Sequence, residues 1–179
     1  MSKTTIPAGG LASDSVTTAK IADDAVTAAK AGFSAGKILQ VVNAVNGTVD
    51  ATTSSTLADT SLTLNITPSA TSSTILAIVK INGVYVRHED TSLDLALFRD
   101  STQIVDFGGT VGLVTTALST DSGQTGDGIT YLDSPSSTSQ LTYKVKFASS
   151  DNSQQIQINN YIRGSIRPKS SITLMEIAG

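Results

Sequence analysis

The sequence has no cysteine and no tryptophan, and aromatic residues of all kinds make up only 4% of its 179 residues. The absence of cysteine excludes disulfide bonds and metal sites built from thiolates. The fold must therefore depend on packing alone. A chain of this length fits one domain plus an extension.

Charged residues are also few, at 15% of the chain, with a net charge of −3 and a pI near 4.9. A protein that binds duplex nucleic acid needs a concentrated cationic face, and one that binds a membrane surface needs a basic amphipathic stretch. No apolar run approaches the roughly 18 residues of a membrane span. Residues 1–6 lack the apolar core of a secretory signal. We predict no nucleic-acid partner and no membrane association.

Hydroxyl side chains are abundant, since Ser and Thr together supply 49 of the 179 residues. Thr tolerates extended backbone well, so this composition favours strands and turns over helices. A hydroxyl-rich chain without a secretory signal is typical of a virion component that is made in the host cytoplasm and released by lysis. We therefore predict a virion location.

A ten-residue unit occurs twice in succession, at 11–20 and 21–30, with six of its ten positions identical. A unit this short cannot bury its own apolar side chains, and it becomes stable by pairing with further copies. We therefore predict an oligomer in which this segment forms a short stalk ahead of a folded head. The expected axial residues are the large apolar ones, Leu11, Val16, Ile21 and Val26.

The conformation of the repeat stays open at this stage. Apolar residues every five positions fit neither a helix nor a strand. A second set follows the three-and-four spacing of a coiled coil, but its residues are small and would form a weak seam: Ala12, Ser15, Ala19, Ala22, Val26, Ala29 and Phe33. We favour an irregular, intertwined segment. Residues 1–34 are thus predicted to be an N-terminal stalk segment; the resemblance described below implies that it also attaches the protein to a virion.

Residues 35–179 consist of short apolar runs separated by clusters of Ser, Thr, Gly and Asp. Several runs have a period of two, as at 62–66 and 141–147, which is typical of strands. Short strands with turns at this spacing predict an all-β knob domain, a β-sandwich or jelly roll. We expect eight or nine strands, near 38–45, 57–67, 74–87, 93–107, 111–118, 129–133, 139–148, 154–163 and 171–178.

Two of these runs, 75–81 and 93–98, have apolar residues on both faces. Strands of this kind are usually covered from two sides. We therefore expect either a subunit interface or a loop that folds over the sheet at these positions. The predicted core residues of the domain are Ile75, Ala77, Val79, Ile81, Leu93, Leu95 and Leu97.

The segment 119–128 is too polar and too rich in glycine for a strand, so it is predicted to be an exposed loop, with Gln124, Thr125 and Asp127 as candidate contact residues. His88 is the only histidine, and its neighbours Glu89 and Asp90 point to a solvated turn. Three further acids, Asp121, Asp127 and Asp133, lack the dense oxygen spacing of a calcium motif and favour turns instead. We predict no metal and no cofactor.

Catalysis has no support in the sequence. There is no Gly-x-Ser-x-Gly motif, and the single histidine has no evident serine partner. A pair of carboxylates for glycan hydrolysis remains open from sequence alone, since the chain has 15 acidic residues. We predict that the protein is not an enzyme.

The sequence resembles a family of phage fibre proteins, especially those of marine and cyanobacterial phages. The resemblance covers nearly the whole chain and depends on the order of its motifs, which are the tandem repeat at 15–20 and 25–30, and the segments 36–42, 64–76, 97–100, 132–135, 142–145 and 172–177. It implies a homotrimer with an N-terminal attachment segment and a C-terminal knob similar to the jelly roll of tumour necrosis factor. Only two repeats are present, where tail fibres often have many.

These observations predict a homotrimeric phage fibre that projects a knob for recognition of the host surface. Its partners would be further copies of itself, phage tail or capsid proteins bound through the N-terminus, and a host glycan or protein. The alternative is a head fibre or decoration protein bound to the capsid shell. The copy number per virion separates the two, because capsid decoration requires far more copies than a tail fibre. A secreted jelly-roll ligand of eukaryotic type is disfavoured by the missing signal.

Overall fold

The computed structural model describes residues 17, 36–86, 91–107, 125–151, 153–160 and 167–179. The chain divides into two compact units, Met1–Ala35 and Gly36–Gly179, next to the predicted division after residue 34. The stalk residues predicted from the repeat lie outside the described residues: Leu11, Val16, Ile21 and Val26. Only the second unit is described below.

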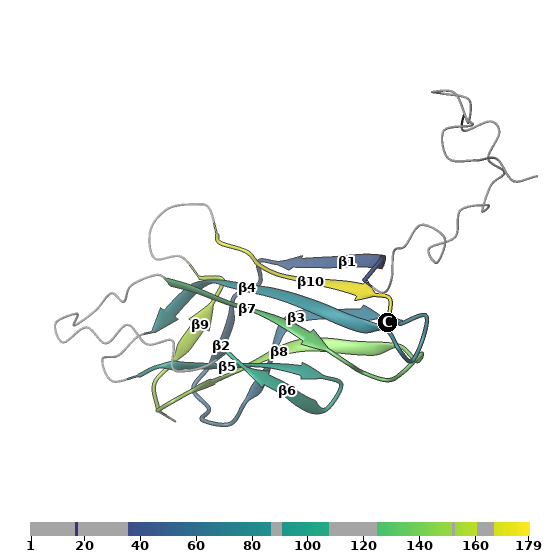
Figure 1. The fold of residues 1–179 in the computed structure, drawn as a ribbon. Coiled ribbons are helices and arrows are strands. Elements are labelled where there is room, and N and C mark those ends of the chain that lie inside the picture. Colours follow the sequence, from purple (N-terminus) through teal and green to yellow (C-terminus); the bar gives the residue numbers. More distant parts are fainter. Residues whose placement is uncertain (1–16, 18–35, 87–90, 108–124, 152, 161–166) are drawn as a thin grey trace, which may run out of the picture. The chain divides into compact units, whose positions relative to one another are not determined.

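The described part of Gly36–Gly179 contains ten strands (Figure 1). In chain order they are β1 (Ile38–Asn46), β2 (Asp50–Thr52), β3 (Ala58–Ile66), β4 (Thr74–Val86), β5 (Leu93–Arg99), β6 (Thr102–Asp106), β7 (Thr125–Asp133), β8 (Leu141–Ser149), β9 (Ile156–Ile158) and β10 (Ser170–Ile177). The period of two in 141–147 becomes the alternating burial of β8. The strand expected at 111–118 lies outside the described residues.

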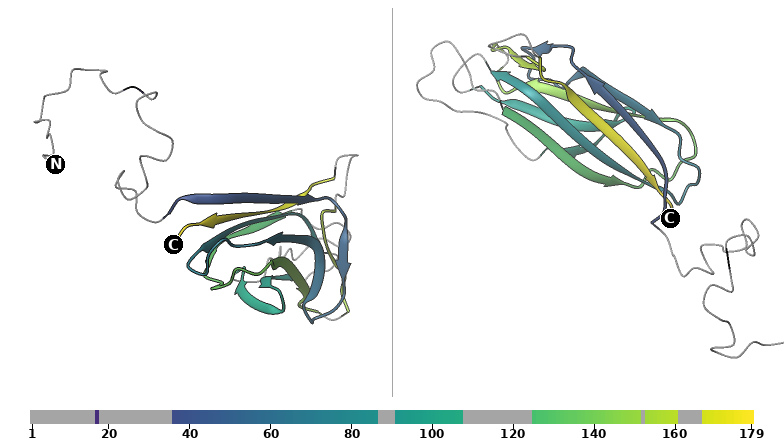
Figure 2. Two further views of the ribbon diagram at one scale, coloured as in Figure 1. Left: turned by 90° about the vertical axis from the view of Figure 1, so that its right-hand side faces the viewer. Right: turned by 90° about the horizontal axis from the view of Figure 1, so that it is seen from above.

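The strands form two antiparallel sheets that face each other (Figure 2). In the first sheet β1, β10, β4 and β7 are neighbours, and the far end of β4 also pairs with β9, which pairs with β2. The order of the second sheet is β3-β8-β5-β6. Strands from the two ends of the chain thus alternate within each sheet, which is the arrangement of an eight-stranded jelly roll. The prediction of an all-β sandwich is confirmed.

The core lies between the two sheets and is largely aliphatic. The seven residues expected there are all buried, with at most 3% of each side chain's surface exposed: Ile75, Ala77, Val79, Ile81, Leu93, Leu95 and Leu97. Tyr143 and Phe147 on β8 are the largest buried side chains. The second sheet supplies both of them, whereas the first sheet contributes mainly Ile, Val and Leu.

The apolar run expected as one strand over 93–107 is two strands, β5 and β6, joined at Asp100. Asp100 has a φ of 55°, a left-handed conformation that Asp tolerates better than most residues. Its backbone N–H donates to Thr142 O at 2.7 Å, and its Oδ1 accepts from Thr142 N at 2.9 Å. The reversal is therefore stabilised by β8, which is distant in sequence.

The exposed loop expected over 119–128 is corrected at its C-terminal end, because β7 begins at Thr125 and includes Asp127. Glycine normally weakens a strand, but here it allows close pairing with β4. A Cβ at Gly128 would lie 2.5 Å from Val79 O, closer than any side chain tolerates. Gln124 lies outside the described residues.

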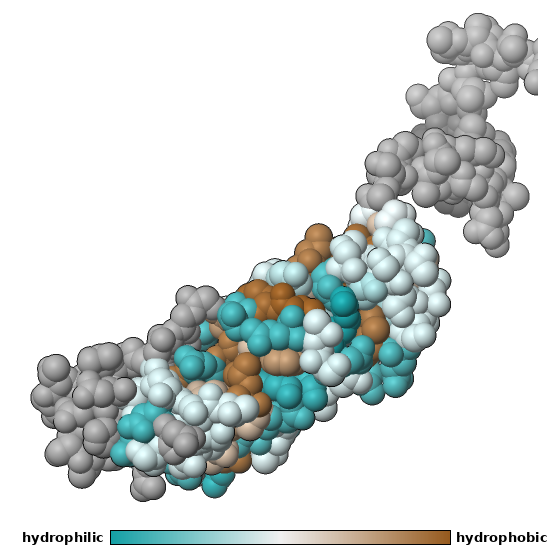
Figure 3. All heavy atoms as spheres, turned by 90° about the horizontal axis from the view of Figure 1, so that it is seen from below, coloured by the Kyte–Doolittle hydropathy of each residue, from teal (hydrophilic) through white to brown (hydrophobic). Residues whose placement is uncertain are grey.

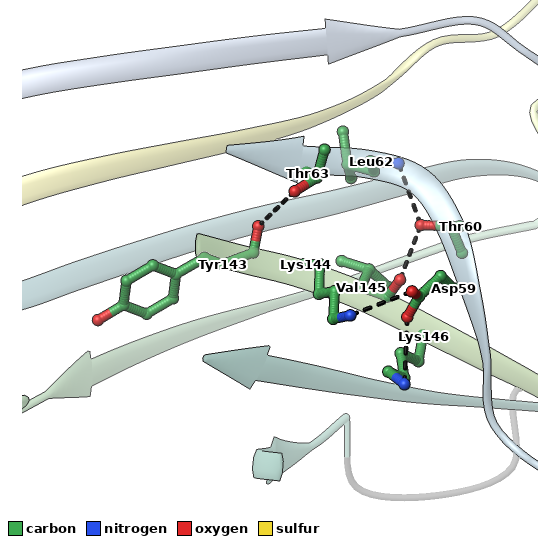
Figure 4. A network of polar contacts seen from close by, with 8 residues as sticks. All are labelled: Asp59, Thr60, Leu62, Thr63, Tyr143, Lys144, Val145 and Lys146. Carbon is green, nitrogen blue, oxygen red and sulfur yellow. Dashed lines mark hydrogen bonds and ion pairs between the residues drawn. The ribbon is translucent and has the colours of Figure 1, made fainter. Parts of the chain in front are cut away.

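A bulge in β3 is stabilised by the side chain of Thr60 (Figure 4). Asp59 pairs with Lys146 and Thr63 with Lys144, so β3 has extra residues between these two pairs. The buried Thr60 hydroxyl donates to Val145 O at 2.8 Å and accepts from Leu62 N at 3.1 Å. One side chain thus satisfies two backbone groups that the ladder leaves unpaired.

Replacing Thr60 with valine should lower the free energy of unfolding by about 1.5 kcal/mol, because the shape is kept while two backbone groups lose their partner. Urea denaturation followed by circular dichroism measures this change. Thr63→Val is the matched control, since Thr63 is exposed and its hydroxyl bond to Tyr143 O is longer, at 3.3 Å. Equal losses in the two variants would show that the Thr60 hydroxyl does not stabilise the bulge.

Candidate functional site

The outer face of the first sheet carries a continuous row of large apolar side chains. Val41 pairs with Met175, Met175 with Leu76, and Leu76 with Leu132, so one residue from each of β1, β10, β4 and β7 lies in register. These four residues are the apolar row. Val41 and Leu132 are 53% and 54% exposed, whereas the neighbouring β10 residue Glu176 is buried. The row therefore lies on the outside of the sandwich.

Further apolar residues extend the row along the strands. Ile38 pairs with Ile177 beside it, and Ile78 lies two residues further along β4. Within the described residues, all six exposed large hydrophobic side chains lie on β1, β4 and β7: Ile38, Leu39, Val41, Val45, Ile78 and Leu132. Apolar exposure is thus concentrated on one of the two sheets.

The outer face of the second sheet differs from this one because it carries ion pairs between strands (Figure 4). Asp59 on β3 forms ion pairs with Lys144 at 3.0 Å and Lys146 at 3.1 Å on β8. The hydrogen bond from Lys144 is the main cause that lowers the pKa of Asp59. The Lys146 ammonium also lies 4.7 Å from the centre of the Phe98 ring. Seen from this side, hydrophilic residues surround the apolar ones (Figure 3).

A buried ionic network joins the two sheets at Asp133, the last residue of β7. Arg99 Nη1 on β5 lies 2.7 Å from Asp133 Oδ1 and 2.6 Å from Oδ2, and the Tyr143 hydroxyl on β8 donates to Oδ2 at 2.6 Å. Burial and the hydrogen bond to Asp133 raise the pKa of Tyr143, so this hydroxyl stays protonated. Burial acts to lower the pKa of Arg99, but the hydrogen bond and charge of Asp133 raise it overall.

A second buried carboxylate, Glu176 on β10, is held by neutral donors only. Its Oε2 accepts from Gln40 Nε2 at 2.6 Å. Its Oε1 accepts from Ser69 N at 2.7 Å, Ser69 Oγ at 2.6 Å and Ser73 Oγ at 2.7 Å. Burial acts to raise the pKa of Glu176, but the bonds from Ser69, Gln40 and Ser73 outweigh it and lower the pKa to about 2. The hydrogen bonds of this carboxylate therefore link the turn between β3 and β4 to β10 and β1.

Sequence reasoning considered Asp133 only as a candidate calcium ligand and did not single out Arg99, Tyr143 or Glu176, although the motifs of the fibre resemblance contain all four. Arg99, Asp133 and Tyr143 lie in segments 97–100, 132–135 and 142–145, and Glu176 lies in 172–177. In each of these segments the sequence places a polar side chain next to apolar residues of a predicted strand, and this is the feature that could have drawn attention to them. Alone, such a residue does not reveal its partner, because the partners are distant in sequence.

Two of the three acids considered for calcium, Asp127 and Asp133, are described, and they lie apart on β7. Asp133 is engaged by Arg99 and Tyr143, whereas Asp127 lies six residues away on β7 and accepts from Gly128 N at 2.7 Å. Asp121 and the segment 87–90, with His88, lie outside the described residues. In the part of the chain that the structure describes, no three His, Asp or Glu side chains converge as metal ligands do.

Among known proteins, only solved structures match the chain. No protein-family model and no curated protein sequence matches the chain. Among solved structures, the VP2 subviral particle of infectious bursal disease virus aligns with a TM-score of 0.40 and 12% identity, over 77% of this chain and 39% of that one. A structure of the Gx strain of the same virus aligns with a TM-score of 0.30 and 10% identity, over 79% and 37%.

The chain thus spans about two fifths of the length of these viral proteins. Likeness at this level does not extend to function. As for membranes, the described residues include no helix with the length and hydrophobicity that a bilayer span requires.

Proposed function

We propose that the protein is a non-enzymatic structural component of a virion, a homotrimeric phage fibre. Residues 1–34 attach it to phage tail or capsid proteins and hold three chains together, and the jelly roll projects as a knob that contacts a host glycan or protein. The observation that carries this proposal is the order of the chain: a tandem repeat that needs further copies, followed by a compact jelly roll. Jelly rolls form viral capsid and lectin domains, among others.

The buried acidic residues of the jelly roll support a structural role over a catalytic one. The buried carboxylates of Asp133 and Glu176 already have hydrogen-bond donors on both of their oxygens. They bridge strands, which stabilises the sandwich and leaves no free base at either position. The net charge of −3 further favours a partner other than nucleic acid.

The knob would bind its receptor through weak, repeated contacts. A surface rich in Ser and Thr provides hydrogen bonds and little charge, which suits shallow contact with glycan hydroxyls or with a protein. Three knobs on one fibre, and several fibres on one particle, convert a weak single contact into strong attachment because each bound knob raises the effective concentration of the next.

Light scattering on the purified full-length protein should give a mass about three times the 18.4 kDa of one chain. Three chains are expected because the fibre proposal requires the repeats of different chains to cover one another. Bovine serum albumin, measured in the same run, checks the calibration of the scattering mass, which does not depend on the shape of the molecule. A single species at the mass of one chain across the micromolar range would contradict the proposal.

A further inference from the structure

The packing of the described jelly roll does not explain the apolar row of Val41, Met175, Leu76 and Leu132. Its residues come from four separate strands, yet the strand registers bring them into one line. Strands lie about 4.8 Å apart, so the row is roughly 14 Å long. Exposed apolar patches of this kind on a soluble domain mark sites of association.

The row belongs to a face of sufficient size for a protein contact. β4 pairs with β10 and β7 over Ile75–Lys80 and beyond, and β1 adds a fourth strand. Four strands about eight residues long cover roughly 19 by 26 Å, or about 500 Å² in projection. A standard interface buries about 800 Å² on each partner, so this face supplies most of one.

The composition of the face favours a protein partner over a charged polymer. Next to the row lie Thr173, Ile78 and Thr130 in register, then Ser171, Lys80 and Gly128. Lys80 is the one charged side chain in these positions. An apolar centre depleted of charge with a polar margin is how the buried core of an interface differs from the rest of a protein surface.

We propose that this face is where copies of the chain pack against one another, so that the jelly rolls as well as the repeats hold the fibre together. A second copy is the occupant that the chain favours, because the repeat that requires other copies immediately precedes β1, whose first residues border the row. Gly36 N donates to Ala178 O at 3.0 Å, and Ala178 N donates to Lys37 O at 2.9 Å. The chain therefore enters the jelly roll beside Ile38 and Ile177, next to the row. The inference rests on the proposed trimer and names its second contact surface.

The absence of cysteine from the whole sequence allows a direct test, since one introduced thiol is the only thiol present. Val41→Cys places it in the apolar row, and Val45→Cys places it on the same strand and face, about 13 Å away, beside Ser171. The two valines are similarly exposed, at 53% and 57%. The full-length variants are reacted with N-ethylmaleimide as the trimer and again at a dilution where light scattering shows one chain.

In the trimer, the thiol at 41 should react at least about tenfold more slowly than the thiol at 45, because the centre of an interface excludes solvent while its margin does not. On dilution to single chains, the two rates should become equal. If the variant at 41 does not assemble, Leu132→Cys, at the other end of the row, replaces it.

Three results overturn the inference, and they differ in what they leave standing. Equal rates in a confirmed trimer that also stay unchanged on dilution mean that the jelly rolls do not meet through this face, while the fibre proposal survives. Protection at 41 that persists in single chains identifies a segment of the same chain as the cover. A wild-type protein that never forms a trimer overturns the inference together with the proposed function.

Discussion

Replacing Asp133 with asparagine should lower the free energy of unfolding by about 3 kcal/mol. The substitution removes the negative charge that pairs with Arg99, whose side chain is only 24% exposed, and leaves a poorer acceptor for the fully buried Tyr143 hydroxyl. Breaking one partner of a buried ion pair typically costs about 3–5 kcal/mol, and the partial exposure of Arg99 places this site at the lower end. Urea denaturation followed by circular dichroism measures the loss.

Two further variants separate the charge from the packing. Tyr143→Phe removes the hydroxyl alone and should cost about 1–2 kcal/mol, because the Asp133–Arg99 pair stays intact. Asp94→Asn is the control for loss of a carboxylate, since Asp94 is exposed on β5, and it should change stability by less than about 0.5 kcal/mol. If Asp133→Asn and Asp94→Asn had equal effects, the network would contribute nothing to holding the sheets together.

The stability of the protein should fall steeply below pH 4.5, and Glu176 should account for a distinct part of that fall. Its pKa of about 2 in the folded state lies below the ordinary value of 4.5. The folded state thus holds this proton less tightly than the unfolded state. The resulting stabilisation is complete above pH 4.5 and is lost as the pH falls towards 2. Its size is on the order of 2 kcal/mol.

Glu176→Gln isolates this contribution. The variant should be less stable than the wild type by about 2 kcal/mol at pH 7, because an uncharged amide accepts the four hydrogen bonds poorly. The difference should shrink as the pH approaches 2, where the wild-type carboxyl also becomes neutral. Unfolding curves of both proteins between pH 7 and 2 give this difference in stability directly. The aspartates are the same in both proteins, so their titration does not contribute to the difference.

Ser73→Ala tests the cause of the lowered pKa. It removes one buried donor to Glu176 Oε1, so the pKa should rise and the acid-induced loss of stability should begin at higher pH than in the wild type. Ser137→Ala, in the exposed turn between β7 and β8, is the matched control and should leave the acid curve unchanged in position. A difference between the wild type and Glu176→Gln that is constant over the whole pH range would contradict the proposed role of the carboxylate.

The sandwich itself was predictable because it depends on a local pattern. Strands with a period of two bury one face, and the runs that become β3 and β8 have that period. The predictions were wrong at positions where backbone geometry outweighs the preference of a residue type for loops or strands. Gly128 was assigned to a loop, yet its missing side chain lets β7 approach β4, and Asp100 breaks one apolar run into two strands.

The apolar row and the two buried networks could not be predicted from the sequence, for a different reason. Each depends on pairings between residues far apart along the chain: Gln40 and Glu176 are separated by 136 positions, and Arg99 and Asp133 by 34. The sequence indicated that 75–81 is apolar on both faces and therefore needs a cover. It contained no information on which residues of other strands would line up beside Leu76.

Alternation of apolar and hydroxyl side chains was thus enough to determine an all-β chain with an aliphatic core, because burial of alternate residues is a property of each strand by itself. The tertiary structure alone decided that Val41, Met175, Leu76 and Leu132 form one line, and that Asp133 and Glu176 are buried with their donors. Those outcomes depend on strand order and register, and register is set only when all the strands pack together.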